Sequence, residues 1–405
     1  MKKILTFISM AFWFAVGCTA KDVLITECGA KVGKNKISTE AIQKAIDLCH
    51  KSGGGKVIVP KGKFATGAIV LKNGVKLHLE EGAVLYGSKR PADYVLKKDR
   101  KDIIWTTQLI FAQGAKNIGI TGSGVIDGRG AGFTDQACNA VGVTRPMLIR
   151  FDSCRDIIVS GVTLRNSAVW MQHYYACDNL VIKGITVDDF CNNCNDGIDI
   201  TCCNNVTISD CLIESDDDGI CLKTTSLRPC QNVTVTNCTV SSHCNALKIG
   251  LESLGDFSNI TFRNCRVRPS NKKVFNGLAS GISAIAVESV DGGNIRNVVF
   301  DQIDVVGTEA PIFVRLGDCG NTYDQKVPKR RKGTLSGVSI SNVTVTGAGN
   351  TGCSITGLPG QHVEDIKLSN ISITHKSHII TNYRNITVIN GYIVLNSYRC
   401  HSCYI

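Results

Sequence analysis

Two groups of aspartates lie close together in the middle of the chain. The stretch "CNNCNDGIDITCCNNVTISDCLIESDDDGICLK", residues 191–223, holds Asp196 with Asp199 and then Asp216, Asp217 and Asp218. Crowding carboxylates raises the pKa of at least one of them, which then keeps a proton while a neighbour stays ionised. Such a set can supply a general acid and a general base. A solvated acidic turn or a calcium site is the alternative interpretation of "DDDG".

A repeated phrase surrounds these aspartates. Successive copies start 23 to 27 residues apart at first, and each has two short β-branched runs of alternating polarity joined by a polar bend. One copy cannot bury its own apolar side, but a stack of copies can. We therefore predict an all-β fold, a right-handed parallel β-helix with Cys, Val, Ile and Asn side chains in internal ladders. The copies start at Cys154, Cys177, Cys203, Cys230, Phe257, Ile295, Leu335 and Val363.

The stacking predicts where the aspartates lie. Strands in neighbouring coils are about 4.8 Å apart, and Asp196 is about one coil from Asp217 and Asp218, so both groups reach one wall of one groove. The Asn-x-Thr/Ser triplets, such as the one at Asn205, recur at one place in each coil, which favours ladder asparagines over glycosylation acceptors. A helix follows Thr39, its predicted N-cap, and is expected to cover the open end of the solenoid.

The N-terminal segment indicates export. Residues 1–20 have the Lys2-Lys3 pair, an apolar run and small residues, which is typical of a signal peptide cleaved after Ala20. A lipid anchor at Cys18 is the alternative. We predict a single domain over residues 21–405, located in the periplasm, on the outer membrane as a lipoprotein, or outside the cell.

Charge and cysteine usage narrow the partners. The net charge is +11, with one compact basic cluster at residues 329–332 and no basic helical face, so an anionic extracellular polymer is favoured over nucleic acid. The chain has 20 cysteines, many at one position of the repeat. We expect buried thiols or a local disulfide. Zinc bound by Cys191, Cys194, Cys202 and Cys203 is the alternative, and we expect no metal and no cofactor. We expect a monomer.

Several phrases in this order resemble glycoside hydrolase family 28, the polygalacturonases and rhamnogalacturonan hydrolases. The resemblance runs from about Val23 to about His375. It rests on "AIQKAIDLC…GGGKVIVPKGKF", "TGAIVLKNGVKLHLEEGAVL", "GVIDGRG", "LRNSAVWMQHYYAC", "NDGIDI" and "DDGICLK".

The resemblance implies roles for the carboxylates. Asp217 would protonate the leaving oxygen, Asp196 and Asp218 would activate water for inversion, and Asp199 would hold the site in place. The implied substrate is an acidic, galacturonic-acid-containing polysaccharide or oligosaccharide of the plant cell wall.

Two departures concern the substrate contacts. The family's Gly-His-Gly falls on Cys244, Asn245 and Ala246, so its histidine is replaced unless His243 reaches the site. The Arg-Ile-Lys that grips a galacturonate carboxylate falls on residues 284–286, "AIA". Candidate substrate contacts are Asn245, His243, Lys248, Glu288, Arg315 and His173, the last of which is equally typical of a packed coil histidine.

These departures leave two other functions open. One is a pectate-lyase-like elimination that uses calcium and a basic residue. The other is a carbohydrate-binding β-helix that has lost its activity. The region after about residue 375 is atypical for the family, and "YRNITVINGYIVL" is expected to form a last coil.

Overall fold

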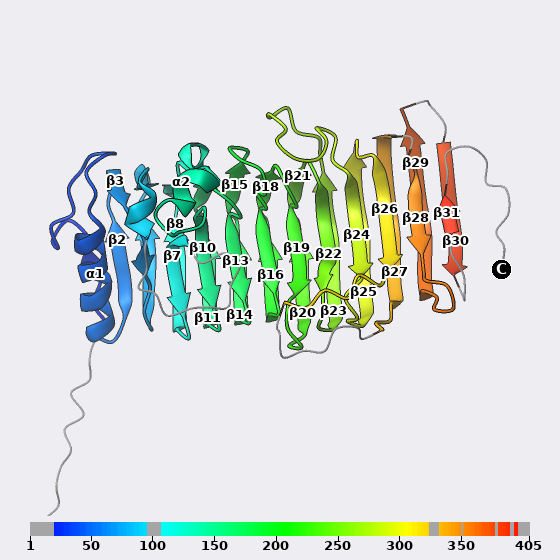
Figure 1. Ribbon diagram of the computed structural model, residues 1–405, viewed down its shortest axis with the longest axis horizontal. Helices are drawn as coiled ribbons and strands as arrows, with labels where there is room; N and C mark the ends of the chain where they lie inside the picture. Colours follow the sequence, from blue (N-terminus) through cyan, green and yellow to red (C-terminus); the bar gives the residue numbers. More distant parts are fainter. Residues whose placement is uncertain are drawn as a thin grey trace, which may run out of the picture.

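The computed structural model describes residues 20–94, 107–323, 332–349, 351–376, 380–388 and 393–395. The chain winds into a parallel β-helix whose coils are stacked along the long axis (Figure 1), which confirms the predicted fold class. The predicted signal peptide, Cys18 and three members of the basic cluster at 329–332 lie outside the described residues. Among the helices in the described part of the chain, none is both long and apolar enough to cross a membrane.

Each coil contributes strands to parallel ladders that run the length of the molecule. Ladder A contains β1 Val23–Leu24, β2 Gly55–Val59, β5 Val75–Leu79, β8 Lys116–Gly122, β11 Arg155–Ser160, β14 Asp178–Lys183, β17 Asn204–Ser209, β20 Cys230–Thr236, β23 Phe257–Val267, β25 Ile295–Val306, β27 Ser336–Ala348, β29 Glu364–His375 and β30 Ile380–Val388. Ladder B contains β3 Gly62–Thr66, β6 Ala83–Gly87, β9 Val125–Asp127, β12 Thr163–Arg165, β15 Thr186–Asp189, β18 Leu212–Ser215 and β21 Thr239–Ser242.

Ladder C carries the third side of the coils. It contains β4 Ile69–Val70, β7 Gln108–Gln113, β10 Met147–Asp152, β13 Gln172–Tyr175, β16 Ile198–Thr201, β19 Ile220–Thr224, β22 Asn245–Ser253, β24 Ser283–Ser289, β26 Ala310–Leu316, β28 Cys353–Thr356 and β31 Ile393–Leu395. From β23 onward, ladders A and B share long strands, since β23 pairs with both β20 and β21.

The register of ladder A follows the sequence repeat. Arg155 pairs with Asp178, and Asp178 pairs with Asn204. These are the second positions of three successive repeats, so equivalent positions of neighbouring repeats lie side by side in the ladder. The cysteine at the first position of these repeats is buried, and its thiol reaches the carbonyl of the preceding coil: Cys177 Sγ lies 3.3 Å from the Phe151 oxygen, and Cys203 Sγ 3.2 Å from the Tyr174 oxygen. The described cysteines are free and most of them are buried, but Cys28, Cys191 and Cys194 are half-buried and Cys319 is exposed.

The asparagine ladder lies outside the solenoid, which corrects the prediction of an internal one. Asn205 donates to Asn179, Asn232 to Asn205, and Asn259 to Asn232 at 3.0 to 3.2 Å, and all of these contacts are exposed. These asparagines have positive φ, for example 56° at Asn232. Asparagine tolerates this left-handed conformation better than most residues, which explains the repeated Asn at each bend.

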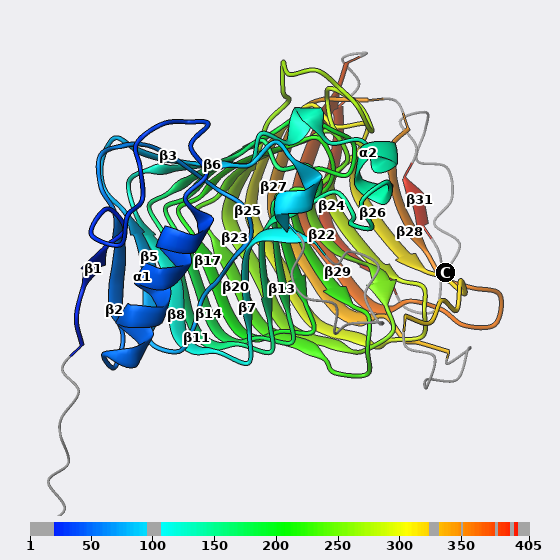
Figure 2. The same cartoon turned by 60° about the vertical axis from the view of Figure 1, so that its left-hand side comes forward.

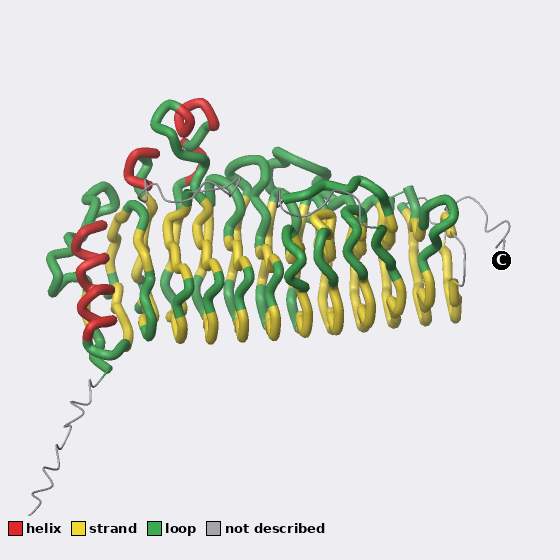
Figure 3. The backbone as a smooth tube through the Cα atoms, turned by 60° about the horizontal axis from the view of Figure 1, so that its bottom comes forward, coloured by secondary structure: helices red, strands yellow, loops and turns green. Residues whose placement is uncertain are grey.

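The N-terminal end carries helix α1 (Thr39–Lys51), which lies across the first strands (Figures 2 and 3). Its apolar face buries Ile42, Ala45, Ile46 and Cys49. The predicted N-cap was wrong by one residue: Ser38 occupies the cap position, and the Thr39 hydroxyl instead accepts a hydrogen bond from the Gly67 amide at 2.7 Å. The other helices within the described residues are α2 (Asp135–Asn139) and the short 3₁₀ turns Pro91–Tyr94 and Gly130–Gly132.

The C-terminal end does not continue the parallel stack. Strand β30 pairs antiparallel with β29, and β31 pairs antiparallel with β28. The predicted last coil is therefore wrong: the chain turns back on itself, so the last strand pairs are antiparallel where the coils before them pair in parallel.

Candidate active site

The candidate site lies on the outer face of ladder C. Alternation along each strand sends Ile198, Ile200, Ile220 and Leu222 into the core. The residues between them therefore face outward. In this outward set, His173 pairs with Asp199, Asp199 with Cys221, and Cys221 with Lys248, so side chains from four successive coils share one row.

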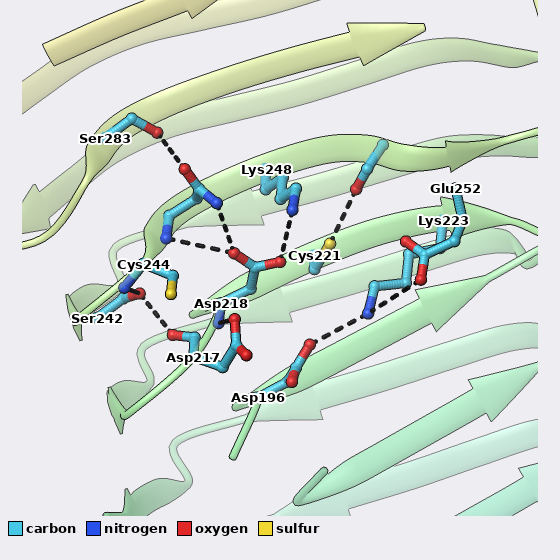
Figure 4. A network of polar contacts seen from close by, with 12 residues as sticks. Asp196, Asp217, Asp218, Cys221, Lys223, Ser242, Cys244, Lys248, Glu252 and Ser283 are labelled. Carbon is cyan, nitrogen blue, oxygen red and sulfur yellow. Dashed lines mark hydrogen bonds and ion pairs between the residues drawn. The ribbon is translucent and has the colours of Figure 1, made fainter. Parts of the chain in front are cut away.

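Asp196, Asp217 and Asp218 form the centre of this face. Asp196 precedes β16, while Asp217 and Asp218 precede β19 in the next coil, and the Gly197 amide donates to the Asp218 carbonyl at 2.9 Å. One oxygen of each carboxyl group lies within 4.8 Å of one oxygen of the others. Figure 4 shows the three carboxyl groups directed toward one another. The adjacent-coil placement predicted from the repeat is therefore present.

Two lysines neutralise part of this charge. Lys223 Nζ lies 3.1 Å from Asp196 Oδ2 and 2.7 Å from Asp199 Oδ1, and it stands 3.8 Å above the centre of the Trp170 ring. Lys248 Nζ lies 2.8 Å from Asp218 Oδ2. Burial lowers the pKa of Lys223, but Asp196 and Asp199 outweigh burial and raise this pKa well above its ordinary value. The ammonium therefore stays charged.

The carboxyl groups differ in electrostatic environment. Burial, then the neighbouring Asp218, raises the pKa of Asp217. Burial also acts on Asp218, but Lys248, Lys223 and the Asn245 amide outweigh it and lower the pKa of Asp218 below its ordinary value. Burial and the nearby Asp199 raise the pKa of Asp196 despite Lys223. This face therefore combines a carboxyl group that gives up its proton less readily than an ordinary aspartate, Asp217, with one that gives it up more readily, Asp218.

Asn245 holds Asp218 in place, and Asp199 shares the Lys223 ammonium with Asp196. The Asn245 backbone amide and side-chain Nδ2 both donate to Asp218 Oδ1, at 3.2 and 2.7 Å, and its own oxygen accepts from the Ser283 hydroxyl at 2.7 Å. Asp199 is fully buried, and burial raises its pKa to about 6 while Lys223 opposes this shift. Asn245 thus faces the site from the position where the resemblance implies a histidine.

His243 does not face the site. Its side chain is fully buried, and its Nδ1 lies 2.8 Å from Oδ1 of the equally buried Asp216. The neighbouring residues explain this direction, because Asp217 and Asp218 belong to the site while Asp216 is directed into the interior. The prediction that His243 contacts substrate is not supported by this position, since no part of the side chain reaches the surface.

His173 is a packed position on the same face. It is 6% exposed, its Nε2 lies 2.9 Å from the Thr201 hydroxyl, and the Trp170 ring meets it edge-on at 5.1 Å. Burial, then Arg150 and Lys223, lowers the pKa of His173 well below its ordinary value, so the ring is neutral. The neutral, buried imidazole of His173 packs against the side chains around it and has little surface left to contact a substrate.

The remaining predicted contacts lie in the coils after the carboxylates. Lys248 pairs in register with Ala286 of the next coil. Ala286 is the position where the resemblance implies a lysine, so Lys248 places a cation one coil away from it. Glu288 pairs with Arg315 one strand further along. Burial raises the pKa of Glu288, and both Lys248 and Arg315 oppose it, so Glu288 lies in the field of both cations. Arg315 is exposed and forms no ion pair within the described residues.

The carboxylate set is a poor match for a metal. In the described part of the chain, a metal ion could be shared by three or more His, Cys, Asp or Glu side chains that lie close together, and Asp196, Asp217 and Asp218 form such a group. Calcium requires about six to eight oxygen ligands, whereas two of these carboxylates already pair with ammonium groups. The four cysteines around residue 200 do not form such a group among the described residues, and Cys191 Sγ instead donates to the Ser167 carbonyl at 2.9 Å.

Sequence reasoning missed Lys223, Trp170 and Asn276, and it assigned no separate role to Asp216. Lys223 is five residues after Asp218 on β19, and counting alternate positions from the core residues Ile220 and Leu222 would have placed it outward beside Asp196. Trp170 is part of a motif that was recognised but assigned no contact. No local signal identifies Asn276, whose amide donates to Asp217 Oδ2 at 2.8 Å across 59 residues.

The fold and site together define a class: a parallel β-helix with a carboxylate set on the outer face of one sheet, as in enzymes that act on polysaccharides. Residues 49–393 match the family described as "Glycosyl hydrolases family 28". The chain belongs to this family.

Similar proteins of known name agree with this placement. The chain is 32% identical over 224 residues to a "Probable polygalacturonase" of Vitis vinifera, covering 52% of this chain and 46% of that protein. It is 27% identical over 253 residues to an "Exo-poly-alpha-D-galacturonosidase" of Dickeya chrysanthemi, covering 49% and 41%. The chain thus spans less than half the length of these curated relatives.

Solved structures support the fold. The exopolygalacturonase of Thermotoga maritima superimposes with a TM-score of 0.74 at 21% identity, over 93% of this chain and 95% of that one. The family 28 exopolygalacturonase of Yersinia enterocolitica gives 0.73 at 22% identity, over 88% and 71%. At these identities the likeness concerns the fold alone.

Proposed function

We propose that this protein hydrolyses glycosidic bonds in pectic, galacturonic-acid-containing polysaccharides or oligosaccharides. The observation that carries the proposal is the contrast between adjacent carboxyl groups: the pKa of Asp217 is raised, while that of Asp218 is lowered by Lys248. Glycoside hydrolysis requires one carboxyl group to donate a proton and another to act as a base or nucleophile. Membership in the family agrees with this chemistry.

The roles follow from the environments. Asp217 is half-buried and is the general acid that protonates the leaving oxygen. Asp218 is ionised and accepts the proton of the attacking water, with Asp196 orienting the same water from the neighbouring coil. Lys223 and Lys248 limit the build-up of negative charge, because two carboxylates at this separation repel each other strongly in a buried setting.

Inversion of the anomeric carbon is part of the proposal. Inverting enzymes commonly have carboxyl groups about 6.5–9.5 Å apart, with retaining enzymes at about 5–5.5 Å. The oxygens here approach within 4.8 Å, so the spacing does not itself argue for inversion. Family membership supports it instead. Proton NMR of the first-formed product decides the matter: an inverted anomer is expected, and a retained anomer would make Asp196 or Asp218 a nucleophile.

An acidic substrate fits the cations after the catalytic coils. Arg315 is exposed beside Glu288, and an arginine there can bind a carboxylate through two hydrogen bonds. Lys248 has three donors, of which Asp218 uses one. Asn245 is also placed to contact a sugar. The protein would act after export, as a monomer, and the choice between a cleaved signal and a lipid anchor at Cys18 concerns residues outside the described ones.

One experiment separates this function from its alternatives. Reducing ends released from a panel of pectic polymers and oligomers are expected to increase with time, without any gain in ultraviolet absorbance and without loss of activity in a chelator. An unsaturated, ultraviolet-absorbing product that requires calcium would indicate a lyase. Binding of the same oligomers with no product of either kind would indicate a carbohydrate-binding protein.

A further inference from the structure

Loop 268–282, which joins β23 to β24, returns over earlier coils. Lys272 Nζ lies 3.1 Å from Asp188 on β15, and the Leu278 amide donates to the His243 carbonyl at 2.7 Å. The loop thus reaches back across 84 residues of sequence to the coil that contains Asp196. In Figure 1 it is the yellow-green loop that projects at the top of the solenoid near β21. It borders the carboxylate set on the side of Asp217.

A buried pair fixes the loop at its centre. Asp216 Oδ1 accepts from His243 Nδ1 at 2.8 Å and from the Phe275 backbone amide at 2.7 Å, and both side chains of the pair are fully buried. The loop also approaches His243 closely at Gly277, where φ is +73° and a Cβ atom would come within 2.0 Å of the His243 oxygen. Asp216, the first aspartate of "DDDG", and the buried His243 therefore hold the loop together.

Asn276, which follows Phe275 in the loop, reaches the carboxyl group of Asp217. Asn276 Nδ2 donates to Asp217 Oδ2 at 2.8 Å, while Asp217 Oδ1 accepts from the Asp218 backbone amide at 2.9 Å. Both oxygens of the carboxyl group are held, so its plane is fixed. Asn276 therefore reaches Asp217 from loop 268–282 and not from the coils that carry Asp196 and Asp218.

We propose that Asn276 is a positioning residue for Asp217, and that Asp216 with His243 anchors the loop that delivers it; this rests on the proposed hydrolase function. An amide donor stabilises the carboxylate that forms when the acid gives up its proton. Asn276 therefore orients the acid and favours proton transfer to the leaving oxygen. The other titratable groups that act on Asp217 include Asp218, Asp196, Lys223, Cys244 and Cys194.

The test compares Asn276→Ala, Asn276→Asp and a control, Asn271→Ala, in the full chain. Asn271 lies on the same loop, is exposed and forms no hydrogen bond within the described residues. Two quantities are measured: the pH profile of kcat/KM on pectic oligomers, and the pKa of Asp217 from NMR of 13C-labelled aspartates, with its signal identified by its absence in Asp217→Asn.

Loss of the donor favours the protonated acid. In Asn276→Ala the pKa of Asp217 and the alkaline limb of kcat/KM are expected to rise together by about half a unit or more, with kcat falling about tenfold and KM changing less. In Asn276→Asp the added carboxylate is expected to raise both further. Asn271→Ala should change neither.

The outcomes distinguish the inference from the function on which it rests. An active Asn276→Ala enzyme with an unchanged Asp217 pKa would overturn the positioning role, even if the thermal midpoint fell. A wild-type protein that releases no reducing ends from any pectic substrate would overturn the proposed function itself, while the NMR titration would still show whether Asn276 contacts Asp217. An Asp216→Asn variant should shift the Asp217 pKa in the same direction as Asn276→Ala.

Discussion

The ammonium of Lys248 lies 2.8 Å from Oδ2 of Asp218, although the two residues are 30 positions apart in sequence. This ion pair keeps Asp218 ionised directly beside Asp217, which retains its proton more readily than an ordinary aspartate. Two adjacent residues of the same type thereby have pKa values shifted in opposite directions. The difference comes from the coils that pack above and below them, and it leads to the predictions that follow.

Asp217→Asn should abolish hydrolysis while leaving the fold intact. The amide has the same shape but cannot donate the required proton, and general acid catalysis contributes about 10²–10⁴-fold in rate. Release of reducing ends gives the rate, and circular dichroism gives the fold. A variant that keeps more than about a tenth of the wild-type rate would exclude Asp217 as the acid.

The wild-type enzyme should lose activity as pH rises through the raised pKa of Asp217. Burial and Asp218 place that pKa above the ordinary value of 3.8, so the alkaline limb of kcat/KM should lie above pH 3.8. The opposite limb should lie below it, because Lys248 lowers the pKa of Asp218. A rate that continues to rise into alkaline solution would contradict these assignments.

Lys223→Met should destabilise the fold in a pH-dependent way. The change leaves Asp196 and Asp199 buried without their cation, and breaking such a pair costs about 3–5 kcal/mol. The two carboxyl groups then have pKa values further above those of the unfolded chain, so the folded state is favoured when they are protonated and loses stability as pH rises through those values. Thermal midpoints should therefore differ from wild type much more at neutral than at acidic pH.

Lys248→Ala and Arg315→Ala should weaken kcat/KM most for substrates with a free carboxylate. A suitable control is Arg296→Ala, which removes an exposed arginine on β25 in ladder A, away from the face that carries Arg315. Free-acid and methyl-esterified oligomers are compared for each variant. Equal losses on both substrates would show that neither cation recognises the carboxylate.

Asn232→Ala should lower stability, whereas Asn232→Gly should restore most of the loss. Asn232 has a φ of 56° and donates to Asn204 and Asn205 in the preceding coil. A left-handed conformation costs a non-glycine residue about 1–2 kcal/mol. Thermal midpoints measured on the three proteins check this. Equal midpoints for the alanine and glycine variants would indicate that the hydrogen bonds, rather than the backbone, determine the effect.

Much of the fold could be predicted because the sequence repeats. The spacing of the phrases from Cys154 to Phe257 sets the register of ladder A, and alternation of polar and apolar residues sets which side chains face the core. The placement of Asp196 one coil from Asp217 follows from the same spacing. The antiparallel return of β30 could not be predicted, because the segment still has the alternating pattern of a coil strand, and that pattern does not specify direction.

The sequence by itself determined the solenoid and the adjacent carboxylates, because both follow from a phrase that recurs at a regular spacing. It also determined the resemblance to a hydrolase family, because that rests on several phrases in a fixed order along the chain. Only the tertiary structure decided that Asp216 and His243 are directed inward, that Lys223 joins Asp196 to Asp199, and that Asn276 reaches Asp217. These contacts join residues 24 to 59 positions apart or depend on where a loop returns. Their side chains meet because whole coils stack, and no local pattern records which partner lies above or below.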